Sequence, residues 1–223
     1  MVAQLAAGRI DGCCVGEPWN QVAVRSGIGR LLTTSYDLWN NCTEKVLAVG
    51  ADWGRRHPAT LQALLAALLE ASAWLDRLEN RLETAGLLAR ADYVAAPLEA
   101  IAHPLMGYVQ ADPDGPPRHV PDAHVFHRYG ANYPSLGHLL WFARQMHAAG
   151  QLDRPLDLTT ARAVCRPDLY RVAARSLGLP CPDRDLLPEG DHAAPWSLET
   201  PQGTIAMGPD RFLDGARFDP LAG

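Results

Sequence analysis

The sequence of 223 residues lacks the short motifs that mark the common enzyme classes. It has no Walker phosphate loop, no GxSxG nucleophile elbow and no HExxH zinc motif. The five cysteines are scattered and form no CxxC pair, which argues against a zinc site or a disulfide framework. The net charge is −5 and no basic block occurs, so the electrostatic footprint of nucleic-acid binding is missing. We therefore expect a protein that is not an enzyme, with no catalytic residue, metal, cofactor or nucleic-acid partner.

The sequence also has little that would place it in a membrane. Its longest apolar stretches are shorter than a bilayer span, and its first residues show neither the basic region nor the apolar core of a signal peptide. Apolar residues make up 48% of the chain and charged residues 20%, as in ordinary globular proteins. We expect a globular chain that does not itself span a membrane.

The most informative stretch runs over residues 13–45. Its apolar start, residues 13–15, is typical of a short buried strand, and Gly16 is typical of a tight turn. Pro18 fits the first turn of a following helix, which would end at Gly27 or Gly29. Backbone N–H groups at the start of that helix would attract an anion.

Two more apolar segments follow, at residues 31–34 and 46–49, and Lys45 opens the second. If these segments are parallel neighbouring strands, Gly16 and Lys45 border one crevice and form an anion pocket. The alternative is an ordinary turn between a strand and a helix with a surface lysine, because most helix N-termini are merely capped.

The rest of the chain predicts helices followed by a loop-rich end. Apolar spacing predicts helices over residues 57–76, 78–91, 93–102 and 134–149, and another that begins at residues 166–168. From Pro180 onward proline and glycine recur, which indicates a tail that wraps over the body. The spacing of His119, His124, His127 and His138 is too loose for zinc, so we expect packing roles for them.

Several strings of residues, in order along the chain, carry a resemblance to one family. They are VGEPWN at residues 15–20, TTSYDLW at 33–39, TEKVLAVGADW at 43–53, FHRYGANYPSLGHLLWFARQM at 126–146 and GPDRFLDGARFDP at 208–220. Together they resemble the substrate-binding proteins of bacterial ABC importers for nitrate and bicarbonate, and the related soluble nitrate sensors of the cytoplasm.

This resemblance implies an α/β fold of the periplasmic-binding-protein type II class, with two lobes, here incomplete at the N-terminus. Residues 1–50 would form the end of the second lobe, with the strands of the anion pocket and the hinge. Residues 51–179 would be a helical part that returns to the first lobe, and residues 180–223 a wrapping tail.

The resemblance also implies ligand-binding residues. Family members carry lysine at one pocket position when they bind nitrate and glutamate when they bind bicarbonate. Lys45 aligns with that position and favours nitrate, whereas a shift of one residue would place Glu44 there. Gly16 is implied as a backbone donor, and Glu17 either contacts the ligand or caps its own helix. Trp19 is expected to pack, and the family's other ligand residues lie upstream of this chain.

The resulting hypothesis is a solute-binding protein that closes its lobes around nitrate or a related small oxyanion and delivers it to an ABC importer. Its partners would be the importer's membrane subunits, in the periplasm or cell envelope. One alternative is a cytoplasmic nitrate sensor that controls a regulatory protein. Another is an enzyme of thiamine-precursor type on the same fold, which would need a reactive thiol among Cys13, Cys14 and Cys42.

Overall fold

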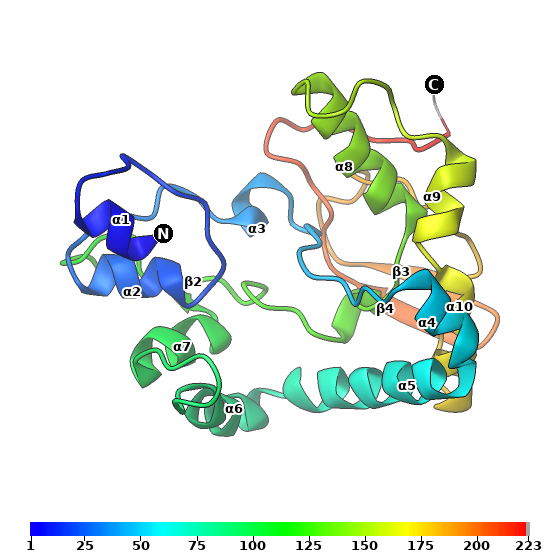
Figure 1. The fold of residues 1–223 in the computed structure, drawn as a ribbon, viewed down its shortest axis with the longest axis horizontal. Coiled ribbons are helices and arrows are strands. Elements are labelled where there is room, and N and C mark those ends of the chain that lie inside the picture. The colour runs from blue at the N-terminus through cyan, green and yellow to red at the C-terminus, as the bar shows by residue number, and fades with distance from the viewer. Residues whose placement is uncertain (222–223) are drawn as a thin grey trace. The chain divides into compact units, whose positions relative to one another are not determined.

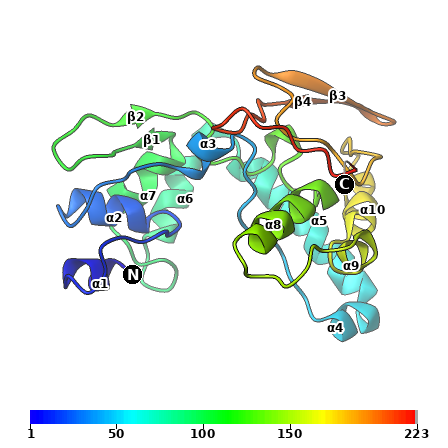
Figure 2. The same cartoon turned by 90° about the horizontal axis from the view of Figure 1, so that it is seen from above.

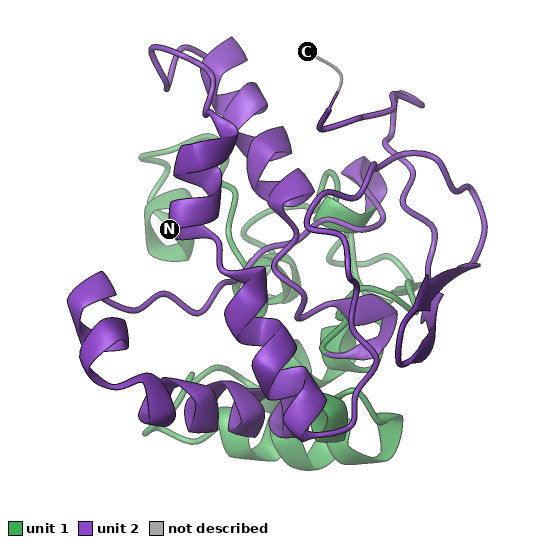
Figure 3. Ribbon diagram, turned by 90° about the vertical axis from the view of Figure 1, so that its right-hand side faces the viewer, with its two compact units in different colours: residues 1–36, 73–126 green, residues 37–72, 127–223 purple. Residues whose placement is uncertain are grey.

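The computed structural model describes residues 1–221 and is mainly helical (Figure 1). It divides into two compact units (Figure 3). Unit 1 contains residues 1–36 and 73–126, and unit 2 contains residues 37–72 and the described chain from residue 127 onward. The predicted division of the chain into residues 1–50, 51–179 and 180–223 refers to the lobes of the resembled fold, and it stays a prediction. The last two residues of its wrapping tail, Ala222 and Gly223, lie outside the described residues.

Unit 1 surrounds a small apolar core with short helices. Its elements are α1 (Val2–Ala6), α2 (Trp19–Arg25), η1 (Leu78–Asn80), α6 (Arg81–Leu88), α7 (Leu98–Leu105), β1 (Tyr108–Val109) and β2 (Arg118–His119). The two strands pair antiparallel. Ala85, Ile101 and Leu105 form the centre of the core. Buried Gln21 joins α2 to the end of β1, because its side-chain amide exchanges two hydrogen bonds of 3.2 Å with the backbone of Gln110.

A buried ion pair fixes the start of α6 in unit 1. The side chain of Arg81 is 3% exposed and that of its partner Asp76 is 8% exposed, with Nη2 and Oδ1 2.9 Å apart. Three further guanidinium N–H groups donate to the carbonyl oxygens of Leu75, Leu105 and His124. Because buried charges need both a counter-charge and hydrogen bonds, this arrangement satisfies the arginine within unit 1.

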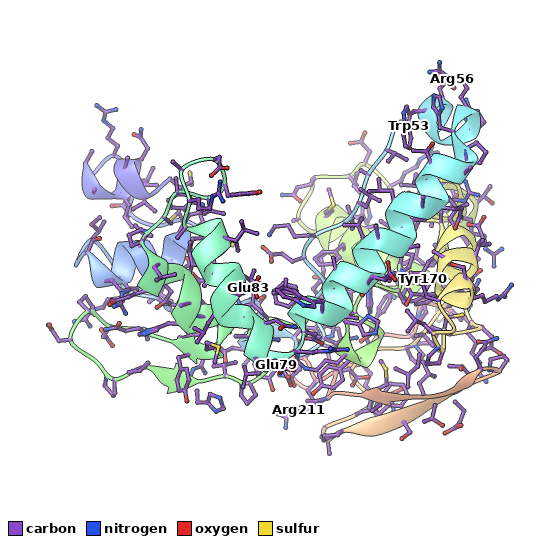
Figure 4. The ribbon with its side chains drawn as sticks, turned by 90° about the horizontal axis from the view of Figure 1, so that it is seen from below. Trp53, Arg56, Glu79, Glu83, Tyr170 and Arg211 are labelled. Carbon is purple, nitrogen blue, oxygen red and sulfur yellow. The ribbon has the colours of Figure 1, made fainter. Side chains whose placement is uncertain are left out.

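Unit 2 contains most of the longest helix and the longer of the two hairpins among the described residues. Its elements are α4 (Ala51–Arg56), the first fifteen residues of α5 (Pro58–Leu75), η2 (Arg128–Gly130), α8 (Leu136–Ala148), α9 (Leu158–Val164), α10 (Pro167–Ser176), β3 (Trp196–Thr200) and β4 (Gly203–Met207); α3 (Ser35–Leu38) spans the boundary between the units. The β3–β4 pair is antiparallel, and Figure 2 shows it as a separate hairpin. Tyr170 of α10 lies beside α5 (Figure 4), in a core cluster with Leu69 and Tyr133.

A second cluster in unit 2 joins distant parts of the chain around Trp39. Its indole is 1% exposed and stacks on Phe212, with ring centroids 5.0 Å apart. Trp141 of α8 lies 4.8 Å from it, and Phe218 completes the cluster. Backbone bridges pair Trp39 with Phe212 and Glu189 with Phe218. The residues near the C-terminus are therefore part of the core of unit 2.

The helices largely follow the predictions, whereas the strands do not. The predicted helices 57–76 and 134–149 correspond to α5 and α8, and α10 starts at the predicted place. The prediction for residues 93–102 is wrong in position, since α7 begins at Leu98 after Pro97. The predicted strands at residues 13–15, 31–34 and 46–49 pair with no other strand among residues 1–221. The β3–β4 hairpin lies in the tail, where no element was predicted.

One prediction about apolar length also needs correction. The 18-residue helix α5 is long and apolar enough to cross a membrane by length and composition, and it is the one such helix among the described residues. The sequence analysis predicts a helix here but no apolar stretch of this length. Helices inside globular proteins pass the same test, so this finding is weak evidence for a membrane segment. Figure 4 shows α5 with Trp53 and Arg56 projecting from α4 directly ahead of it.

A candidate anion site

The turn that contains Gly16 is held by short-range hydrogen bonds in unit 1. The Gly16 carbonyl accepts from the Trp19 N–H at 3.2 Å, and the Val15 carbonyl accepts from the Asn20 side chain at 2.8 Å. These bonds fold the chain into α2 directly after Pro18. The Gly16 residue is half-buried at this turn. The predicted order of extended segment, turn and helix is therefore present, although the extended segment is not a paired strand.

Glu17 performs the capping role, one of the two roles predicted for it. Its Oε2 accepts a hydrogen bond of 3.2 Å from the backbone N–H of Gln21, in the first turn of α2. A carboxylate that satisfies a helix N-terminal donor in this way stabilises the helix and adds negative charge at the turn. Trp19 is 42% exposed, so the expectation that it packs is wrong. It lies on the first turn of a short helix that buries Gln21, Ala23 and Val24 instead.

Lys45 lies in unit 2 with its side chain 79% exposed. Its Nζ is 2.5 Å from Oε1 of Glu44. Residues 44–50 form no strand in this structure. An exposed ion pair of this kind contributes only about 0–1 kcal/mol. An anion in a drier site can therefore compete for this ammonium group.

Lys45 is also the only lysine in the 223 residues, since every other strongly basic side chain is an arginine. An ammonium group is a compact point charge with three donors, which suits a small oxyanion approached from one side. The presence of a single lysine in the sequence is a signal that marks position 45 without any comparison to other proteins. Gly16 and Glu17 belong to unit 1 and Lys45 belongs to unit 2.

The histidines form two carboxylate pairs that sequence reasoning missed. His138 Nε2 lies 2.7 Å from Oε1 of buried Glu189, and His192 Nδ1 lies 2.8 Å from Oδ2 of buried Asp210. The His192 ring also stacks on Trp196 at 3.8 Å. Each pair joins residues far apart in sequence, so no local spacing reveals it. Both pairs help fasten the C-terminal part of the chain within unit 2.

The cysteines are the candidate nucleophiles of the enzyme alternative. All five cysteines are free thiols. Burial raises the pKa of the Cys42 thiol, and the nearby Glu44 carboxylate raises it further. A raised pKa disfavours the thiolate that a nucleophile requires. Within residues 1–221, no group of three or more His, Cys, Asp or Glu side chains is placed to hold a metal ion.

Comparison with known proteins defines the class of this fold. Residues 1–89 match the NMT1-like family. The chain matches the crystal structure of the periplasmic nitrate-binding protein NrtA from Synechocystis with a TM-score of 0.82 and 28% identity, over 99% of this chain and 53% of that chain. It therefore has the α/β fold of about half of a type II periplasmic binding protein, as the sequence predicts.

The sequence relatives are also components of nitrate or bicarbonate importers. The nitrate import ATP-binding protein NrtC of Synechocystis is 39% identical over 86% of this chain and 28% of that protein. The bicarbonate transport ATP-binding protein CmpC of Synechococcus elongatus is 36% identical, over 80% of this chain and 26% of that protein. The nitrate/nitrite binding protein NrtA of Synechocystis is 30% identical over 99% of this chain and 46% of its own length.

These relatives confirm the predicted resemblance to nitrate and bicarbonate importer components. This chain spans less than half the length of each of the three relatives. They are described as binding proteins or as ATP-binding components of importers, and none of the three is described as a sensor or as an enzyme of thiamine-precursor type.

Proposed function

We propose that the chain is part of a solute-binding protein of the periplasm or cell envelope. This protein binds nitrate, or a related small oxyanion, and delivers it to an ABC importer. One observation carries this proposal: the match of 99% of the chain to the periplasmic nitrate-binding protein, at a TM-score of 0.82. The partners would be the membrane and ATP-binding subunits of the importer. The support is that one relative is an ATP-binding protein for nitrate import and another is an ATP-binding protein for bicarbonate transport.

In this proposal the ligand is bound by a cation and by backbone donors. Nitrate is planar, monovalent and accepts hydrogen bonds without donating any, so it needs donors around it. Lys45 supplies the positive charge and Gly16 supplies a backbone N–H group. Glu17 keeps its observed bond to Gln21 and maintains the turn without contacting the anion.

The same residues bear on the choice between nitrate and bicarbonate. Bicarbonate carries an O–H group, for which a carboxylate in the pocket is a good acceptor, whereas a carboxylate repels nitrate. Lys45 at the pocket position therefore selects nitrate. Glu44 would select bicarbonate if it occupied that position instead.

Calorimetry on the full-length gene product that carries these residues tests the proposal. Nitrate should bind saturably at one site per chain, with bicarbonate at least about tenfold weaker, a difference of 1.4 kcal/mol. Chloride, which differs from nitrate in shape, and sulfate, which differs from it in shape and charge, serve as control anions. Binding of bicarbonate in preference to nitrate would contradict the assignment of Lys45, and binding of neither would contradict the proposed function.

A further inference from the structure

The carbonyl groups of Val15 and Gly16 are both held by the first turn of α2. The side-chain amide of Asn20 donates to the Val15 carbonyl at 2.8 Å, and the Trp19 N–H donates to the Gly16 carbonyl at 3.2 Å. The second bond joins two backbone groups, so it does not depend on the side chain at position 19. The first bond depends on the side chain at position 20, because the donor is the amide of Asn20 itself.

The bond from Asn20 also fixes the direction of the Gly16 N–H. The peptide between Val15 and Gly16 is trans, so its C=O and N–H groups point in opposite directions. Because the carbonyl is turned toward Asn20, the N–H is turned away from that side chain. No group among residues 1–221 accepts a hydrogen bond from this N–H. The donor that Gly16 contributes to the proposed site is therefore oriented and has no protein acceptor.

The glycine at this position makes an anchor important. Glycine has no Cβ, so the peptide before Gly16 rotates with little steric resistance. Without the bond from Asn20 this peptide would sample several orientations, and an anion would have to select one of them on binding. A donor that is already oriented in the free protein avoids that loss of entropy, which raises affinity. The hydrogen bond at the carbonyl also polarises the N–H of the same peptide and strengthens it as a donor.

We propose that Asn20 is a positioning residue of the anion site. Its side-chain amide holds the Val15 carbonyl and thereby points the Gly16 N–H at the oxyanion, and Asn20 itself does not contact the oxyanion. This role rests on the proposed function, which supplies a nitrate-like ligand, whereas the orientation of the peptide is a property of the ligand-free protein. Asparagine suits the role because an ionised aspartate would present only acceptors to the carbonyl.

Nuclear magnetic resonance on the full-length gene product tests the orientation without a ligand. Labelling with ¹³C-carbonyl valine and ¹⁵N-glycine selects the glycine amides that follow a valine, which within the 223 residues are those of Gly16 and Gly50. The signal that Gly16→Ala removes is that of Gly16. The ¹⁵N shift of an amide responds to hydrogen bonding at the carbonyl of the same peptide. Asn20→Ala should therefore move the ¹⁵N resonance of Gly16 upfield and leave that of Gly50 unchanged.

Titration of the same labelled protein with nitrate tests the consequence for binding. In the wild type, nitrate should move the amide proton of Gly16 downfield, because the N–H gains an acceptor. Asn20→Ala should weaken nitrate binding by about tenfold and reduce the movement of this proton at saturation.

The matched control is Asn80→Ala. Asn80 is a half-buried asparagine of unit 1, and its side-chain amide also donates to a backbone carbonyl, that of Trp74, at 2.7 Å. Asn80→Ala should lower the midpoint of urea unfolding about as much as Asn20→Ala does, and it should leave nitrate affinity unchanged. A second variant, Asn20→Asp, keeps the size and shape of the side chain and replaces its donor with a carboxylate. It should move the ¹⁵N resonance of Gly16 and weaken nitrate binding at least as much as Asn20→Ala.

Three outcomes would overturn the role given to Asn20. The first is an unchanged ¹⁵N shift of Gly16 in both Asn20 variants, whether or not nitrate binds. The second is wild-type nitrate affinity in Asn20→Ala, or an equal loss of affinity in Asn80→Ala. The third is nitrate binding by the wild type that leaves the amide proton of Gly16 in place. Absence of nitrate binding by the wild type would instead contradict the proposed function, and the ¹⁵N shift of Gly16 would still decide whether Asn20 orients the peptide.

Discussion

At the scale of single residues, the proposed function depends most on the charge of Lys45. Replacing Lys45 with glutamate changes the local charge by two units and removes an N–H donor from the proposed site. We expect Lys45→Glu to weaken nitrate binding by at least about 100-fold, which is about 2.7 kcal/mol. Isothermal titration of the full-length gene product measures this change directly.

A matched variant separates local from general electrostatics. Arg90→Glu makes the same change of charge in an exposed ion pair with Asp92, far along the chain in unit 1. It should leave nitrate affinity within about twofold, because Arg90 is mostly exposed and salt screens the charge of an exposed side chain. An equal loss of affinity in both variants, or none in Lys45→Glu, would refute the role given to Lys45.

Two buried tyrosines give a pH dependence at the same scale. Burial raises the pKa of Tyr170 to about 12 and also raises that of Tyr133. The folded state therefore favours the neutral phenols. This contribution to stability is complete below about pH 10, the ordinary tyrosine pKa, and it is lost as the pH rises through the higher folded-state values.

An alkaline titration followed by phenolate absorbance checks this expectation. Wild-type protein should show a late component at or above about pH 12, and its appearance should accompany loss of tertiary structure. Tyr170→Phe should remove part of that component while leaving the helices intact at neutral pH. If every phenol of the wild type titrates before any structural change, the assignment of Tyr170 to a buried environment is contradicted.

At the scale of elements, the start of α6 depends on the buried Arg81–Asp76 pair. Arg81→Ala removes the counter-charge of the buried Asp76 carboxylate and one donor to each of three carbonyl oxygens, while Asp76 keeps its hydrogen bond from the Phe126 N–H. We expect a loss of about 3–5 kcal/mol in the free energy of unfolding, measured by urea denaturation.

The control for this prediction is the same substitution at an exposed pair. Arg90 and Asp92 are more than half exposed, so Arg90→Ala should cost about 1 kcal/mol or less. Similar effects of the two substitutions would mean that Arg81 is not buried as the structure has it.

The helices were the most predictable elements because their signals are local. The leucines of α5 recur with helical spacing, and Ser135 caps α8 with its side-chain oxygen. The helix α9, which Asp157 caps, was not predicted. The sequence also has the apolar runs of strands at residues 13–15, 31–34 and 46–49. A strand, however, exists only when another strand pairs with it, and sequence alone does not provide the partner.

At the scale of the whole molecule, the C-terminal part of the chain is a structural component of unit 2. Phe212→Ala removes the ring that stacks on Trp39 and leaves a cavity in the cluster. We expect this substitution to destabilise unit 2 by about 3–5 kcal/mol, as measured by thermal or urea unfolding followed by tryptophan fluorescence.

The adjacent residue provides the comparison. Leu213 is 71% exposed, so Leu213→Ala should change stability by no more than about 0.5 kcal/mol. Should Leu213→Ala prove as costly as Phe212→Ala, the assignment of inner and outer faces in this segment would be reversed.

The candidate site was only partly readable from sequence. The turn at Gly16 and the capping role of Glu17 follow from local patterns that the structure reproduces. The importance of Lys45 came from a resemblance, and its proximity to the turn remains a prediction because these residues lie in separate units. The pairs His138–Glu189 and His192–Asp210 had no sequence signal, since each depends on how distant segments pack.

The Trp39 cluster has a consequence for the order of events during synthesis. Trp39 is made before Phe212 and Phe218, which pack against it and follow it by more than 170 residues. At 5–20 residues per second, about 10–35 s pass between the two. During that interval the indole lacks its stacking partner and stays available to chaperones. A ribosome that stalls near residue 208 therefore yields a nascent chain in which this core has not closed.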